Sequence, residues 1–164
     1  LEEAVDKARG IEEIPEAEET AFNLPIPAIL SERYIENEML RLQMYKKIAM
    51  ITSDEDESEI IDELLGGLIG GVSLLGLIVS KIRAMAGKLG ISEISQQGYK
   101  IIFKLLENVK LTERIMAGLI STYGGRMMIN GGREPYIRLT IGKDDPLQAI
   151  EKFLQIAVGE RKPN

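Results

Sequence analysis

Two prolines near the start of the chain, Pro25 and Pro27, constrain the fold more than any other feature. Proline fixes its own φ and disfavours helical backbone at the residue before it, so Leu24 and Ile26 are held in β or polyproline conformation. The strip around them therefore has to lie extended on another surface.

An amphipathic helix is predicted to follow this strip. Its apolar residues recur at three- and four-residue spacing, which places them on one inward face: Ile35, Met39, Leu42, Tyr45 and Ile48. Arg41, Lys46 and Lys47 are then left toward water. Together, the extended strip and this helix favour a docking module.

The complete absence of Cys and His limits the chemistry of the chain. It excludes disulfides, a zinc site built on Cys or His, a thiol nucleophile and any His-based triad. A Cys-free chain of 164 residues, with no signal peptide at its start, is predicted to be one cytoplasmic domain. The start at Leu1 rather than Met suggests a fragment of a longer protein.

Charge is distributed unevenly along the sequence. Residues 1–80 carry 6 basic and 18 acidic side chains, a net charge of −12, and residues 81–164 carry 14 and 8, a net charge of +6. Seven of the acids lie between Asp54 and Glu63. Ser53 is predicted to cap a helix there, so the acids form either a solvated helix start or a surface for a basic partner. The acidic half should repel nucleic acid.

A run of seventeen uncharged residues, Leu64–Ser80, contains five glycines. As a helix it would span only about 26 Å, short of the roughly 30 Å of a bilayer core. A turn followed by a buried helix is therefore favoured over a membrane segment. The inward face of that helix is predicted from Val72, Leu75, Val79, Ile82, Ala86 and Leu89, with Gly90 as its stop.

The second half of the chain alternates strand and helix patterns. Strands are predicted in a hairpin over Ile91–Leu106 and in Arg126–Asn130 and Tyr136–Ile141. A helix over Thr112–Tyr123 should bury Ile115, Met116, Leu119 and Ile120, and one capped by Asp145 should bury Leu147, Ile150, Leu154 and Ala157. The fold class is predicted to be α+β, with helices packed on a small, mainly antiparallel sheet.

No catalytic, cofactor-binding or metal site is predicted. The two glycine-rich patterns that bind phosphate, Gly-x-Gly-x-x-Gly and Gly-x-x-x-x-Gly-Lys-Ser/Thr, do not occur in the sequence. The acids Asp54, Asp56 and Glu59 lack the central glycine and the distal glutamate of a calcium loop. Direct nucleic-acid binding is not predicted either, because only Tyr136 accompanies the basic residues of the second strand pair: Arg126, Arg133, Arg138 and Lys143.

Several short motifs, in order, resemble the C-terminal domain of the bacterial transcription-repair coupling factor (Mfd) family over Phe22–Val158. They are Asn23-Leu24-Pro25-Ile26-Pro27-Ala28, Tyr34-Ile35, Leu40-Arg41-Leu42 with Tyr45-Lys46-Lys47, Ile61-Asp62-Glu63-Leu64, Ile82-Arg83 and Lys88-Leu89-Gly90-Ile91.

The resemblance implies a regulatory, autoinhibitory domain without catalysis, in a parent that is an ATP-dependent DNA translocase. Residues 1–20 would be a helix end and acidic linker from the motor domain, and residues 21–164 the C-terminal domain. Its implied partner is the N-terminal UvrB-like module of the same protein, on which it would mask the UvrA-binding surface. UvrA and RNA polymerase would be indirect partners through the parent; no membrane is implied.

The same resemblance points to Glu63 as an interdomain contact, with Asp62 and Glu59 beside it. Gly66 stands where the family has a second acid, which loosens this expectation. The alternatives are a membrane-interface module using Leu64–Ser80, a general protein-interaction module, and a small enzyme with a perturbed Lys or Tyr in a pocket.

Overall fold

The computed structural model describes residues 20–25, 33–56, 59–60 and 74–162 of the chain, which divides into two compact units. The first unit is Pro25–Ser80; it contains helix α3 (Glu38–Ala49) and is called the α3 unit. The second combines Leu1–Leu24 with Lys81–Asn164 and is the sheet unit. Of the predicted linker over residues 1–20, the structure describes only Thr20. The boundary between the linker and the domain therefore stays a prediction.

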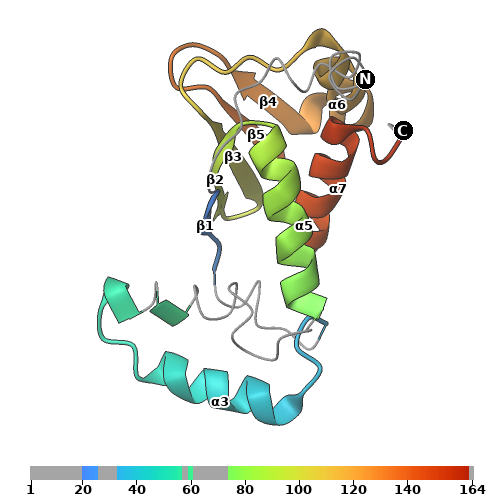
Figure 1. Cartoon of the computed structure of the whole chain (residues 1–164). Helices are drawn as coiled ribbons and strands as arrows, with labels where there is room; N and C mark the ends of the chain where they lie inside the picture. The colour runs from blue at the N-terminus through green and yellow to red at the C-terminus, as the bar shows by residue number, and fades with distance from the viewer. Residues whose placement is uncertain (1–19, 26–32, 57–58, 61–73, 163–164) are drawn as a thin grey trace. The chain divides into compact units, whose positions relative to one another are not determined.

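Within the described residues, the sheet unit holds one five-stranded sheet of order β1-β2-β3-β5-β4 (Figure 1). The strands are β1 (Ala21–Asn23), β2 (Ile91–Gln97), β3 (Lys100–Leu105), β4 (Met127–Asn130) and β5 (Tyr136–Thr140). β1 runs parallel to β2, whereas the other neighbouring pairs are antiparallel. The predicted α+β class with a small, mainly antiparallel sheet is confirmed.

β1 lies just before the two prolines, and Leu24, which follows it, is buried. The strand pairs with Glu93–Ser95 of β2, and the Thr20 hydroxyl donates a 2.8 Å hydrogen bond to the Ile91 carbonyl. The predicted extended conformation is thus confirmed for Ala21–Asn23, and the surface on which it lies is a sheet edge. Pro27 lies outside the described residues.

The predicted hairpin is formed by β2 and β3. Its turn is Gly98-Tyr99, where Gly98 has a φ of +59°, a conformation that glycine adopts without steric penalty. The hairpin brings Ile94 opposite Phe103, on the face of the sheet that is buried.

The core of the sheet unit covers one face of the sheet. Side chains alternate along β3 and β5, so those on one face are buried and those between them are exposed or half-buried. The buried ones are Ile101, Phe103, Leu105, Ile137 and Leu139. The Phe153 ring of helix α7 (Pro146–Val158) stacks on Phe103 with ring centroids 4.1 Å apart, which fixes α7 on this face.

The α7 boundaries follow from its sequence. The Asp145 side chain accepts a hydrogen bond from the Gln148 N–H at 3.1 Å, Pro146 occupies the first turn, and Gly159 ends the helix with a φ of +84°. All four residues predicted to face inward are buried, and so are Phe153, Ile156 and Val158.

Helix α6 (Glu113–Tyr123) begins at Thr112, whose hydroxyl accepts from the Ile115 N–H, and leads into a short 3-10 turn, η1 (Gly124–Arg126). Its buried stripe is Ile115, Leu119 and Tyr123. The predicted burial of Ile120 is wrong, since 53% of that residue is exposed. The buried residues of α6 are four positions apart, so the buried stripe continues from Leu119 to Tyr123, and Ile120 lies beside it.

Helix α5 (Leu74–Lys88) includes the predicted buried helix. Val79, Ile82, Ala86 and Leu89 are buried as expected, whereas Val72 lies outside the described residues and the side chain of Leu75 is not described. Gly90 follows with a φ of +68°. Across the ranges that the structure describes, no helix combines the length and apolarity needed to cross a bilayer.

In the α3 unit, Asn37 caps α3 by accepting from the Leu40 N–H at 3.1 Å. The predicted inward face is wrong for Met39, Leu42 and Tyr45, which are exposed by 68%, 49% and 53%. Of its other two members, Ile35 is buried and Ile48 is half-buried. The buried residue of α3 is Met44, which shares four-residue spacing with the half-buried Leu40 and Ile48. Two apolar stripes compete on α3, and the one at four-residue spacing is inward.

Candidate interaction surfaces

The acidic segment is ordered at its start by a network of hydrogen bonds. The Ser53 hydroxyl accepts from the Asp56 N–H at 3.2 Å, and the Asp56 carboxylate accepts from the Thr52 N–H and hydroxyl at 3.2 and 3.0 Å. The bonds from Thr52 hold the pKa of Asp56 below its usual value. The predicted Ser53 cap is confirmed, and Asp56 serves the helix start.

Of the three acids that the resemblance singles out, Glu59 is exposed, whereas Asp62 and Glu63 lie outside the described residues. Their role as an interdomain contact stays a prediction. Among the residues that can be placed, no group of three His, Cys, Asp or Glu side chains is arranged to hold a metal ion.

An exposed apolar row on α3, made of Met39, Leu42 and Tyr45, is called the α3 stripe. These residues lie at three-residue spacing, so they share one side of the helix. Lys46 is exposed next to them, and the Arg41 guanidinium donates to the Ile35 carbonyl at 3.0 Å. Exposed Met, Leu and Tyr side chains in a row are typical of a protein-binding surface.

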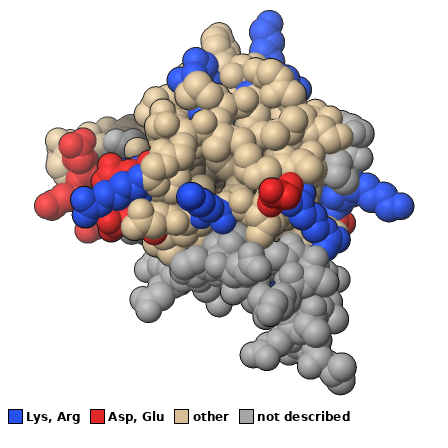
Figure 2. Space-filling model, turned by 90° about the horizontal axis from the view of Figure 1, so that it is seen from above, with Lys and Arg blue, Asp and Glu red and all other residues tan. Residues whose placement is uncertain are grey.

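The basic residues of the second strand pair do not form one cationic patch. Arg133 forms a salt bridge with Glu107 at 2.6 Å, Arg126 lies over the Tyr123 ring, and Arg138 donates to the Met128 sulfur at 3.2 Å. On the face that Figure 2 shows, Lys and Arg side chains stand apart from one another. This scattering does not favour nucleic-acid binding, which uses a continuous basic surface.

Tyr123 is the buried titratable side chain with the largest perturbation in the described part of the chain. Burial raises the pKa of its phenol to about 12, despite the nearby cations of Arg126 and Arg161. Its hydroxyl oxygen is buried with no hydrogen-bond partner among the described residues. A phenol shifted in this direction stays protonated, which is opposite to what a general base requires.

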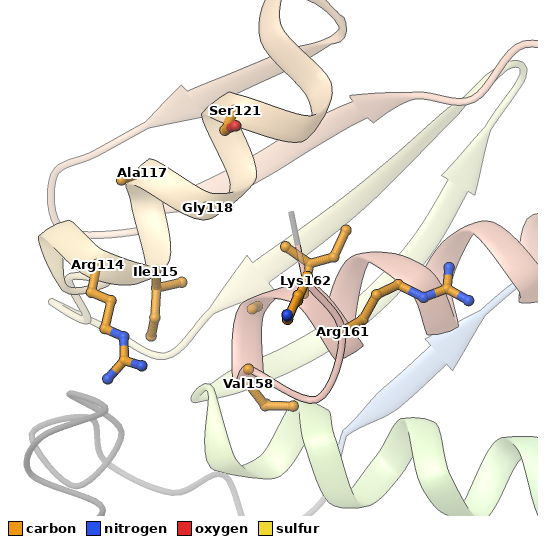
Figure 3. A pocket seen from close by; sticks show the side chains of 11 residues that line it. Arg114, Ile115, Ala117, Gly118, Ser121, Val158, Arg161 and Lys162 are labelled. Carbon is orange, nitrogen blue, oxygen red and sulfur yellow. The ribbon is translucent and has the colours of Figure 1, made fainter. Parts of the chain in front are cut away.

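The surface of the sheet unit is hollowed between α6 and the end of α7, at a site called the α6–α7 groove (Figure 3). Its volume is about 540 Å³. α6 contributes Arg114, Ile115, Ala117, Gly118 and Ser121, and the end of α7 with the following turn contributes Ile156, Ala157, Val158, Gly159, Arg161 and Lys162. No motif in α6 or in the C-terminal residues predicts a site from the sequence alone.

Two further hollows lie on the same unit. One of about 420 Å³ is lined by acids and bases of α7 and its start, including Asp144, Asp145, Glu151 and Lys152. The other, of about 590 Å³, contains the Arg133–Glu107 salt bridge together with Lys104 and Glu134. Both therefore mix opposite charges.

The comparison with protein families decides the relationship of this chain to known proteins. The TRCF domain model matches residues 24–115, more than half of the chain. The chain belongs to the TRCF domain family. The sequence-based identification with transcription-repair coupling factors is confirmed.

Curated relatives of this TRCF domain are transcription-repair-coupling factors. The protein from Staphylococcus haemolyticus is 32% identical over 162 residues, which are 94% of this chain and 14% of that protein. The protein from Staphylococcus epidermidis is 32% identical over 168 residues, again 14% of its length. The chain thus spans about one seventh of the length of these relatives.

Among solved structures, the crystal structure of the C-terminal domain of a transcription-repair coupling factor is similar, with a TM-score of 0.45 and 17% identity. The match covers 88% of this chain and 95% of that chain.

Most motifs that carry the resemblance serve the fold of the TRCF domain. Their apolar members are buried: Leu24, Tyr34, Ile35, Ile82, Leu89 and Ile91. Arg83 lies over the Phe22 ring at 5.2 Å, which ties α5 to β1. Other described motif residues, among them Leu42, Tyr45 and Lys46, are exposed and do not contribute to the core.

Proposed function

We propose that this TRCF domain is the non-catalytic C-terminal domain of a transcription-repair coupling factor and that its role is regulatory. It docks on the N-terminal UvrB-like module of the same protein and covers the surface that recruits UvrA. DNA translocation, ATP hydrolysis and the recognition of RNA polymerase belong to other parts of the parent. Membership in the TRCF domain family supports this choice of parent protein. Because the chain corresponds to only 14% of the length of its relative, we assign those activities to the rest of the parent.

The observation that carries docking is the exposure of the α3 stripe. Met39, Leu42 and Tyr45 lie within the region that matches the family model, and they are exposed in the chain by itself. A partner surface that covers them removes apolar area from water, which stabilises the docked state. The exposed Lys46, which follows Tyr45 in α3, adds a polar contact that water can replace when the domain opens.

UvrA binding to the full-length parent tests this proposal. Deleting the domain should increase UvrA affinity about 5- to 150-fold, the range of an ordinary coupling energy between sites. The triple variant Met39→Ser, Leu42→Ser, Tyr45→Ser should reproduce much of this gain. Tyr99→Ser, which changes a 67% exposed tyrosine in the β2–β3 turn, is the matched control and should leave the affinity unchanged.

Glu63→Lys sharpens the same experiment. If Glu63 faces an arginine of the N-terminal module, its reversal creates a like-charge pair and should reproduce part of the effect of the deletion. Glu134→Lys, at an exposed position of the sheet unit, controls for net charge. Equal UvrA affinity for the wild type, the deletion and the stripe variant, at one salt concentration, would refute masking.

A further inference from the structure

The α6–α7 groove differs from the other hollows of the sheet unit in its charge. Its described lining residues include three cationic side chains, Arg114, Arg161 and Lys162, and none of them carries a carboxylate. All three residues are exposed. Arg161 also lines the neighbouring hollow that contains Asp144, Asp145 and Glu151, whereas Lys162 lines only the α6–α7 groove among the hollows described above. A groove lined by one sign of charge attracts ligands of the opposite sign.

The floor of the groove is apolar and is lined by small residues. Ile115, Ile156 and Val158 are buried beneath it, while Ala117, Gly118 and Gly159 leave space above them. Figure 3 shows Arg114 and Ile115 on the α6 side and Lys162 and Arg161 on the α7 side. A ligand seated there therefore meets aliphatic carbon in the middle and cations at the sides.

We propose that the α6–α7 groove binds a short acidic segment of a partner protein, with an aliphatic side chain on the floor and carboxylates beside Arg114 and the Arg161-Lys162 pair. The charges select the carboxylates, since charge-assisted bonds from arginine are among the stronger hydrogen bonds. The apolar floor favours a peptide over a phosphate chain, because it offers burial to an aliphatic side chain. The volume of about 540 Å³ admits a few side chains rather than a folded surface.

This site is independent of the docking proposed above. All residues of the groove belong to the sheet unit, and the α3 stripe and Glu59 belong to the α3 unit. Loss of peptide binding and loss of UvrA masking are thus separable outcomes.

The test uses the 164-residue chain and a fluorescein-labelled peptide, Asp-Glu-Asp-Leu-Glu-Leu-Asp-Glu, followed by fluorescence anisotropy. The double variant Arg161→Glu, Lys162→Glu should weaken binding about tenfold, because two attractive contacts become repulsive. Ala117→Leu, which fills the groove from an exposed helix position, should also weaken it. A peptide with Ser in place of both Leu residues should bind more weakly than the parent peptide.

Lys110→Glu, Lys143→Glu is the matched control, since it changes the net charge equally at exposed positions outside the groove. It should alter the affinity less than about twofold at physiological salt. Circular dichroism of each variant confirms that it is folded. The proposal is overturned if the wild type does not bind the peptide, if both double variants lose affinity equally, or if a single-stranded DNA oligonucleotide binds the groove more tightly than the peptide.

Discussion

Helices α3 and α7 have similar lengths, 12 and 13 residues, yet they use their apolar side chains in opposite ways. α7 buries seven residues against the sheet and α6, whereas α3 buries only Met44. Three large apolar side chains of α3 remain in water. Exposed apolar side chains contribute little to folding, so α7 contributes more to stability than α3 does, and the exposure of α3 supports its proposed role in docking.

Charge separates the two units in the same way. The α3 unit carries the acidic segment, with Asp54, Glu55 and Glu59 exposed, and the sheet unit carries the α6–α7 groove with its three cations. Two surfaces of opposite charge on one domain suit two different partners. The regulatory and peptide-binding proposals therefore predict independent losses of function.

The largest expected effect lies in α7. Phe153→Ala removes a ring that stacks on Phe103 and contacts the Tyr123 ring, and it leaves a cavity in the core. We expect a loss of about 3–5 kcal/mol in the free energy of unfolding, measured by urea denaturation.

Leu42→Ala is the matched truncation in α3. With Leu42 49% exposed, it should cost less than about 1 kcal/mol, as for other surface changes. A loss as large as that of Phe153→Ala would show that the α3 stripe is buried in solution, and the contrast between the two helices would disappear.

The same contrast explains what could be predicted from the sequence. α7 has one apolar stripe between a clear cap, Asp145, and a clear stop, Gly159, so its limits and buried face were predictable. α3 has two apolar stripes, and only tertiary packing decides which one turns inward. Periodicity identifies an amphipathic helix, but it does not choose between two apolar faces.

The candidate site was less predictable than the fold. Arg114 and Arg161 are 47 positions apart in the sequence and have no motif in common; the packing of α6 beside α7 places both on one groove. The excess of basic residues from Lys81 onward is the one sequence feature that indicates a cationic site, and it does not show where in the fold the site lies. The Tyr123 hydroxyl, which has no hydrogen-bond partner in the described part of the chain, likewise depends on packing and has no local signature.

Helix caps provide a finer comparison of the two units. Asp145 and Asn37 each accept a hydrogen bond of 3.1 Å from the N–H three residues later, at the starts of α7 and α3. Replacing either by Ala should cost its helix about 1 kcal/mol. We expect Asp145→Ala to lower the denaturation midpoint, because α7 is part of the core, and Asn37→Ala to accelerate amide exchange mainly within α3. Faster exchange throughout the chain in Asn37→Ala would show that the units unfold together.

An effect that depends on pH is expected at Tyr123, where the pKa and the packing can be tested together. Burial raises the folded-state pKa to about 12 from an ordinary value of 10.0, so between these values the folded state holds a proton that the unfolded state has lost. The stabilisation is complete below about pH 10 and decreases as the pH rises toward 12.

Tyr123→Phe should remove this dependence of stability on alkaline pH. At neutral pH it should raise stability by up to about 1 kcal/mol, because a buried hydroxyl without a partner among the described residues is removed. Denaturation midpoints at neutral and alkaline pH measure both effects. A loss of stability at neutral pH would show that the hydroxyl has a partner in solution, and an unchanged alkaline slope would show that the phenol is accessible to water.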